Sequence, residues 1–256
     1  MYEFYSEGFF GYGDVGDFHA YGPAHIIPIL LLVGAVVFTF LKSDAIRNWK
    51  HEKTLRLWLA FSMLMAEYFF YWRVMYVGNE HDENTLITLL PFQLCEWGAI
   101  CAAFMILSLN DRLFGINFFV SIIGAGIALA VPQTVIYKTG PTYFRYYQFW
   151  MEHLIPIYTV FYAVAVHKKR PKYRDIWIAY GAMVLLTIPA TIANMKFPQT
   201  NYLYLRMDLP LMPDSYPARV VIYSAIIISA FHILFGVWCL FDKFVLSKRE
   251  KANDGK

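Results

Sequence analysis

Long runs of apolar residues alternate with short polar segments along the whole chain. A helix needs roughly 20 residues to cross the hydrocarbon core of a bilayer. Seven apolar runs approach or exceed that length, and they cover residues 24–41, 55–77, 86–108, 113–131, 148–166, 176–194 and 219–241. The pattern predicts an all-α, polytopic membrane helix bundle with seven transmembrane helices, in a single integral membrane domain of residues 1–256.

Composition supports a membrane protein and excludes an ordinary soluble domain. Of the 256 residues, 58% are hydrophobic and only 16% are charged, whereas about a quarter of the residues in a soluble domain are charged. Small residues recur four apart in "SIIGAGIALA", residues 121–130, a spacing that favours close helix packing in lipid. We therefore expect the fourth run, 113–131, to lie near the centre of the bundle.

Basic residues predict the orientation of the chain, since Lys and Arg accumulate in short cytoplasmic loops. They gather at 42–56, at 167–175 and in the C-terminal tail, whereas the N-terminal segment and the connection near 79–85 contain none. This predicts an extracytoplasmic N-terminus and a cytoplasmic C-terminus in a multi-pass protein of the cell membrane. The net charge of +3 then reflects contact with anionic lipid and gives no reason to expect nucleic acid as a partner.

Polar residues within the apolar runs gather, on this topology, in the outer half of the membrane. Such residues need a partner, a cavity or a function, because exposure to lipid is costly. We expect one outward-opening cavity to collect Glu67, Arg73, Gln93, Cys95, Glu96, Glu152, His153 and, at the start of the first run, His25. Arg145, Asn201 and Arg206 in the external connections would bind a lipid headgroup.

Cys95 and His153 are the candidate catalytic pair. A thiol needs a nearby base, since the thiolate is the nucleophile, and His153 is the nearest candidate in the same leaflet. Structural explanations stay open: a packing cysteine, a histidine bonded to a backbone carbonyl, and for Arg73 a guanidinium that reaches the headgroups. No metal-ligand spacing and no nucleotide-binding loop occurs in the sequence, so we expect neither a metal nor a cofactor.

Four stretches, "FHAYGPAHIIPIL", "LLPFQLC", "FRYYQFWMEH" and "NYLYL", resemble the YwaF-like family of integral membrane proteins. That family is similar to eukaryotic transmembrane acyltransferases that move acyl chains between phospholipids without coenzyme A, and distantly to androgen-induced transmembrane hydrolases. The resemblance implies that Cys95 and His153 are the catalytic cysteine and histidine. The chain departs from the pattern at Gln93, where many relatives have a histidine.

These observations lead to one main functional hypothesis and two alternatives. The main one is an acyltransferase or lipid ester hydrolase that acts on membrane phospholipids or lysophospholipids, in which His153 takes the thiol proton, Cys95 attacks an acyl ester, and Glu152, Gln93 or Glu96 orients the groups. The first alternative is a transporter or lipid-moving protein that uses the same polar cluster for binding. The second is a receptor or assembly factor without chemistry.

Overall fold

The computed structural model describes residues 9–10, 18–76, 90–131, 140–206 and 213–247, and this part of the chain is helical without any strand. The elements follow the order α2 (Pro23–Leu41), α3 (Ser43–Arg47), α4 (Glu52–Tyr76), α6 (Leu94–Ser108), α7 (Asp111–Val120), η1 (Ser121–Ala125), α8 (Gly126–Ala130), α10 (Phe144–Val166), α11 (Tyr173–Lys196), η2 (Tyr202–Tyr204), α12 (Tyr216–Phe241) and η3 (Asp242–Leu246). η2 is a 3₁₀ turn, and η1 and η3 are π-helical.

Five of the described helical segments are long and apolar enough to cross a membrane. They are Pro23–Leu41, Asp111–Ala130, Phe144–Val166, Tyr173–Lys196 and Tyr216–Leu246, and each coincides with one of the predicted spans. The two other predicted spans correspond to α4 and α6. α4 has 25 residues but contains charged ones such as Lys53, Glu67 and Arg73, and α6 has only 15 residues, about 22 Å of helix. The chain is therefore a multi-pass membrane protein.

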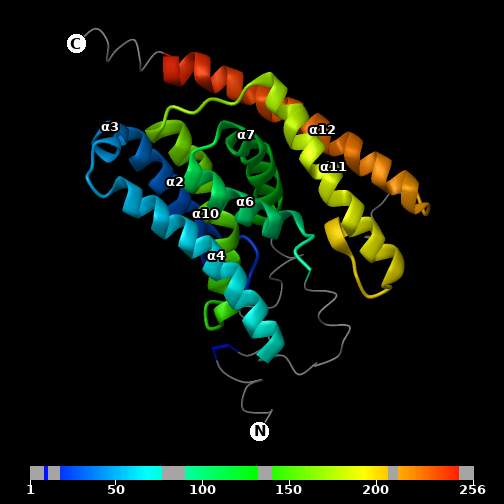
Figure 1. Cartoon of the computed structure of the whole chain (residues 1–256). Coiled ribbons are helices and arrows are strands. Elements are labelled where there is room, and N and C mark those ends of the chain that lie inside the picture. The colour runs from blue at the N-terminus through cyan, green and yellow to red at the C-terminus, as the bar shows by residue number, and fades with distance from the viewer. Residues whose placement is uncertain (1–8, 11–17, 77–89, 132–139, 207–212, 248–256) are drawn as a thin grey trace.

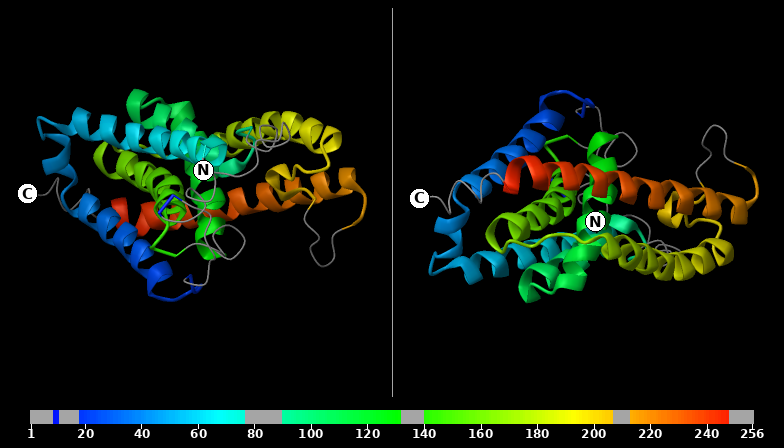
Figure 2. Two further views of the ribbon diagram at one scale, coloured as in Figure 1. Left: turned by 90° about the horizontal axis from the view of Figure 1, so that it is seen from below. Right: turned by 90° about the horizontal axis from the view of Figure 1, so that it is seen from above.

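The most buried of these five segments is α10, whose apolar window is 72% buried, against 56% for Asp111–Ala130. α10 contacts α2, α4, α6, α7 and η1. Figure 2 shows it between α2 and α4, which diverge from α3. The centre of the bundle is thus shared between the expected fourth run and α10.

α11 and α12 run side by side along one flank of the molecule (Figure 1). Only 6% of the apolar window of Tyr216–Leu246 and 11% of that of Pro23–Leu41 is buried, and large apolar side chains such as Leu31, Val221 and Ile233 are exposed. These faces suit contact with lipid acyl chains. The buried contacts are made instead by Phe118 and Phe119 of α7 with Trp238 and Phe231 of α12.

Small residues on α6 allow α4 to pack closely against it. Ala99, Ala102 and Ala103 are buried, and Ala102 and Ala103 belong to one cluster with Met63 of α4 and Tyr162 of α10. Short side chains let helix backbones approach in lipid, where van der Waals packing replaces the hydrophobic effect between helices. This packing fixes how α4, α6 and α10 are rotated against one another, and so which polar side chains meet.

The segments predicted to be cytoplasmic lie together at one end of the bundle. The Arg47 guanidinium donates to the carbonyl oxygen of Val166, His167 lies 2.8 Å from Glu52, and Arg170 lies 3.2 Å from Asp242 at the end of α12. These contacts join the connections near 42–56 and 167–175 to the C-terminal end of α12. The predicted polar cluster lies at the opposite end of the same helices.

Candidate active site

Cys95 lies in the first turn of α6, two residues after the residue that caps the helix. α6 begins at Leu94, and Gln93 is its extended N-cap, so the residues around Cys95 form a helix start rather than the interior of a long span. The Gln93 side chain accepts from Leu203 N at 3.0 Å and donates to Asn201 O at 3.4 Å. These bonds hold the start of α6 against the "NYLYL" segment, and the Cys95 side chain is half-buried.

His153 faces this thiol from the middle of α10. The side-chain ligand atoms of Cys95, Glu152 and His153 all lie within 4.8 Å of one another. Nδ1 of His153 is 2.8 Å from the carbonyl oxygen of Phe149, so Nδ1 carries the proton and Nε2 presents its lone pair. The ring is fully buried, and Nε2 has no hydrogen-bond partner among the described residues.

Glu152 is held by two other side chains of α10. Gln148 Nε2 donates to its carboxylate at 2.8 Å, and Arg145 Nη1 approaches the same oxygen at 3.4 Å. The Arg145 guanidinium also lies over the ring of Phe70 of α4, 4.8 Å from its centroid. Residues three and four apart share a helix face, so the motif "FRYYQFWMEH" places this polar row along α10 toward α4 and α6.

Two further carboxyl groups surround the pair. Glu67 of α4 is 4% exposed, and neither of its carboxyl oxygens has a hydrogen-bond partner among the described residues. Glu96 is also buried, and it accepts from Gln93 N at 3.4 Å. Glu67, Glu96 and Glu152 are within electrostatic range of one another and of Arg145. An unpartnered buried carboxyl group is costly, and Glu67 therefore stands out in this cluster as a group that needs a further polar partner.

The remaining predicted site residues make contacts that stabilise the fold. His25 accepts from Tyr21 N at 2.9 Å and lies 2.7 Å from Leu129 O, which joins α2 to α8 rather than to Cys95. Arg73 donates to Phe10 O at 3.0 Å. The Arg206 guanidinium donates to carbonyl oxygens at the C-terminal end of α11, including those of Pro198 and Asn194, and Arg206 N donates to the Asn201 side chain at 2.8 Å.

Residues that the sequence patterns did not indicate also belong to this region. Tyr71, one turn after Glu67, has a buried hydroxyl without a partner among the described residues and lies within electrostatic range of Glu67, Glu96 and Glu152. Tyr204 is within electrostatic range of Cys95. Spacing by four residues from Glu67 and Glu152 would have indicated Tyr71 and Gln148. Nothing in the sequence pattern indicated Tyr204, because its position depends on the fold of "NYLYL".

Cys95, Glu152 and His153 also have the chemistry of metal ligands. Thiolate, carboxylate and imidazole are the donor types that bind zinc, and the Nδ1 bond to Phe149 O leaves Nε2 free to coordinate. Sequence spacing did not indicate this set, because the thiol comes from α6 and the other two ligands are consecutive on α10. Arg145, beside Glu152, would oppose a cation, so the arrangement suits a nucleophile and its base better.

Comparison with known proteins gives a family and no closer relative. The sequence model of the TMEM164 family matches residues 20–241, which include every candidate site residue. No curated protein matches the chain, and no solved structure does.

Proposed function

Because the chain belongs to the TMEM164 family, a family of transmembrane proteins, and groups a thiol with a buried histidine, we propose that it is a lipid acyltransferase or lipid ester hydrolase. The observation that carries this proposal is the approach of Cys95, Glu152 and His153 to within 4.8 Å. The resemblance to YwaF-like proteins and transmembrane acyltransferases points to the same pair. The substrates proposed are membrane phospholipids or lysophospholipids.

In the first half of the reaction, Nε2 of His153 takes the proton of the Cys95 thiol while the sulfur attacks the carbonyl carbon of a lipid acyl ester. Negative charge develops on the carbonyl oxygen. The first backbone N–H groups of any helix lack a partner within the helix, so those of the first turn of α6 stabilise this charge. The ester C–O bond breaks, the alkoxide takes the proton from His153, and the acyl group remains on Cys95 as a thioester.

In the second half, an acceptor hydroxyl gives its proton to His153 and attacks the thioester carbonyl. The C–S bond breaks, the acyl group leaves on the acceptor, and the Cys95 sulfur takes the proton back from His153. When the acceptor is a lysophospholipid the result is acyl transfer, and when it is water the result is hydrolysis. Neither half needs an oxidant, a metal or a nucleotide.

The neighbouring side chains would position this pair. Gln148 and Arg145 hold the Glu152 carboxylate in place beside His153. Glu96 and Gln93 hold the first turn of α6, which carries Cys95. Arg145 and Asn201 are proposed to meet the lipid headgroup. Arg73, Arg206 and His25 are proposed to support the site through the backbone contacts that each makes.

The proposed topology has seven spans in one membrane domain, with α4 and α6 completing the five apolar helices. The N-terminus is extracytoplasmic and the C-terminus is cytoplasmic, since the basic residues gather at the end opposite Cys95. The active site would then open to the outer leaflet of the cell membrane. The external connection near 79–85 lies outside the described residues.

The decisive experiment traps the thioester. Purified protein in lipid nanodiscs is incubated with a phosphatidylcholine that carries a labelled acyl chain, then quenched in acid, and peptides are analysed by mass spectrometry. We expect a hydroxylamine-sensitive acyl group on Cys95, and loss of both adduct and turnover in Cys95→Ala. Replacing one nucleophilic residue typically lowers kcat by several orders of magnitude.

Cys101→Ala is the matched control, since Cys101 lies on the same helix and is likewise half-buried. It should keep both the adduct and the turnover of the wild type. Wild-type turnover by Cys95→Ala would overturn covalent catalysis at this residue. If the purified wild type binds or moves lipid without cleaving an ester, the transporter alternative replaces the enzyme.

A further inference from the structure

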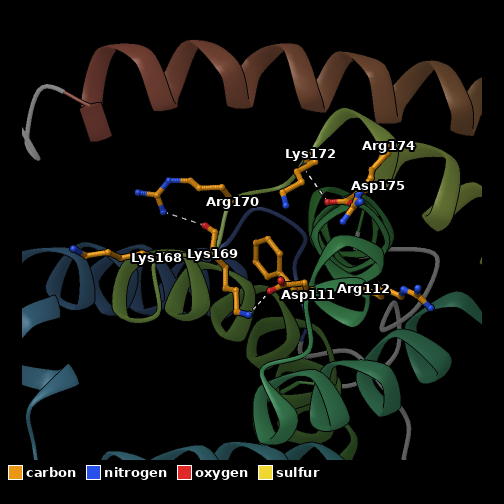
Figure 3. Close-up of a pocket in the computed structure, with 9 residues that line it drawn as sticks. Asp111, Arg112, Lys168, Lys169, Arg170, Lys172, Arg174 and Asp175 are labelled. Atoms are coloured by element: carbon orange, nitrogen blue, oxygen red, sulfur yellow. Dashed lines mark hydrogen bonds and ion pairs between the residues drawn. The ribbon is translucent and has the colours of Figure 1, made fainter.

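A second polar site lies at the opposite end of the bundle from Cys95, where α7 and α11 begin. It is a cavity of about 210 Å³ between the start of α7 and the connection from α10 to α11. Figure 3 shows the side chains around it. Its lining consists of Phe114 and eight charged residues: Asp111, Arg112, Lys168, Lys169, Arg170, Lys172, Arg174 and Asp175.

The charge of this lining is strongly positive. Six of the eight charged residues are basic and two are acidic, which leaves an excess of four positive charges. Asp111 is paired with Lys169, and Asp175 lies 3.7 Å from Arg174 and accepts from Lys172 N at 2.8 Å. Both carboxylates are thus already engaged, and the exposed Lys172 side chain points into the space between them (Figure 3).

The backbone around the cavity is firmly held, which distinguishes it from a flexible basic tail. Lys169 Nζ donates to Leu109 O at 2.5 Å, and Lys169 N donates to Ala163 O at 3.1 Å. Arg170 donates to Val164 O at 3.1 Å and pairs with Asp242 at 3.2 Å. The connection from α10 to α11 is therefore tied to three other segments, and its basic groups keep a fixed spacing.

The ends of two helices add to the positive field. α7 begins at Asp111 and α11 begins at Tyr173, and the N-terminus of a helix carries roughly half a positive charge. The two helices pack closely here, since a Cβ on Gly115 would lie 2.7 Å from Cγ of Asp175. Both helices belong to segments long and apolar enough to span a membrane, so the cavity lies at the level of the lipid headgroups.

We infer that this cavity binds the phosphate of an anionic phospholipid headgroup. Phosphate oxygens accept charge-assisted hydrogen bonds from Lys and Arg, and basic pockets between membrane helices are known to bind such headgroups. Lys172 and Arg174 supply the exposed donors, Arg170 and Lys169 supply the fixed charge behind them, and Phe114 supplies an apolar floor. The inference does not depend on the chemistry at Cys95 or on which end of the bundle is cytoplasmic.

The test compares two double variants that remove the same number of charges. Lys172→Gln/Arg174→Gln removes exposed donors of the cavity, and Lys50→Gln/Lys53→Gln removes exposed charges just before and in the first turn of α4. Each protein is placed in phosphatidylcholine nanodiscs with and without phosphatidylglycerol or phosphatidic acid. Lipid that stays bound is counted by native mass spectrometry after release from the nanodisc.

We expect the wild type and the Lys50/Lys53 variant to retain one anionic lipid. The Lys172/Arg174 variant should bind it on the order of tenfold more weakly, which corresponds to loss of one strong charge-assisted contact. An equal loss of lipid binding in both variants would mean that anionic lipid responds to surface charge in general, and would overturn the proposed site. A parallel titration with inorganic phosphate in detergent separates the sources, since binding of phosphate without lipid retention would also overturn the lipid assignment.

Discussion

At the residue scale, Glu52 accepts hydrogen bonds from three side chains at the basic end of the bundle. Arg56 Nε lies at 2.9 Å, the Tyr162 hydroxyl at 2.9 Å and His167 Nε2 at 2.8 Å. Burial lowers the pKa of His167 below its ordinary 6.5, although contact with Glu52 opposes this shift. The pKa of Glu52 is also lowered, because its hydrogen bonds to His167, Tyr162 and Arg56 outweigh the opposite effect of its burial.

These shifts predict a loss of stability on acidification. Between the folded pKa of His167 and 6.5, the unfolded chain binds a proton that the folded chain does not. His167 therefore contributes stability above pH 6.5 that is lost as the pH falls through the folded pKa. The lowered pKa of Glu52 gives a further loss below pH 4.5. Thermal unfolding in detergent between pH 8 and pH 5 should show a falling Tm, by roughly 2–4 °C for each kcal/mol lost.

His167→Gln should flatten the fall between about pH 7 and pH 5, because glutamine still donates to Glu52 and does not titrate. The matched control is His51→Gln, which changes an exposed histidine next to Glu52 and should keep the wild-type slope. If Tm fell equally with pH in the wild type and both variants, the titration of His167 would not be the cause of the fall.

At the scale of the elements, the close contact of α7 with α11 depends on one glycine. A Cβ on Gly115 would lie 2.7 Å from Cγ and 2.8 Å from Cβ of Asp175, and the Cβ of Asp175 cannot move without shifting the backbone of α11. Gly115→Ala should therefore destabilise the protein by about 1–3 kcal/mol, the usual effect of overpacking. It should also weaken the bond from Lys172 N to Asp175. The measurement is the thermal unfolding midpoint in detergent.

Gly181→Ala provides the matched control on α11, since nothing lies within 4 Å of a Cβ at that position. Alanine favours a helix by about 1 kcal/mol over glycine, so this variant should be as stable as the wild type or more so. If Gly115→Ala unfolded at the same temperature as Gly181→Ala, then α7 and α11 would not be packed as described.

At the scale of the whole molecule, the two ends of the bundle should lie on opposite sides of the membrane. Thr142 is exposed near the start of α10, and Lys50 is exposed in the connection before α4. In a protein with Cys95, Cys101 and Cys239 replaced, a membrane-impermeant maleimide should label Thr142→Cys in intact cells. Lys50→Cys should be labelled only after lysis. The reverse pattern would invert the proposed topology, and labelling of both in intact cells would contradict a crossing between them.

The sequence by itself determined the helical class, the membrane setting and the residues worth considering. Apolar runs of span length identified five helices within a few residues of their ends, since a helix bonds the backbone groups of such a run internally, as lipid requires. Basic residues indicated which connections share an end. Cys95 and His153 stood out because each has polar neighbours in an otherwise apolar stretch.

Only the tertiary structure decided which of those residues meet. Cys95 and His153 are 58 positions apart on α6 and α10, and a helical period predicts the face of one helix but not its rotation against another. That rotation is set by packing, here through Ala99, Ala102 and Ala103. Tertiary contacts also join His25 to the carbonyl oxygen of Leu129 and Gln93 to the backbone N–H of Leu203. The fold also gathers basic side chains of α7, of α11 and of the connection before α11 around one cavity, because local spacing does not determine where separate helices begin in space.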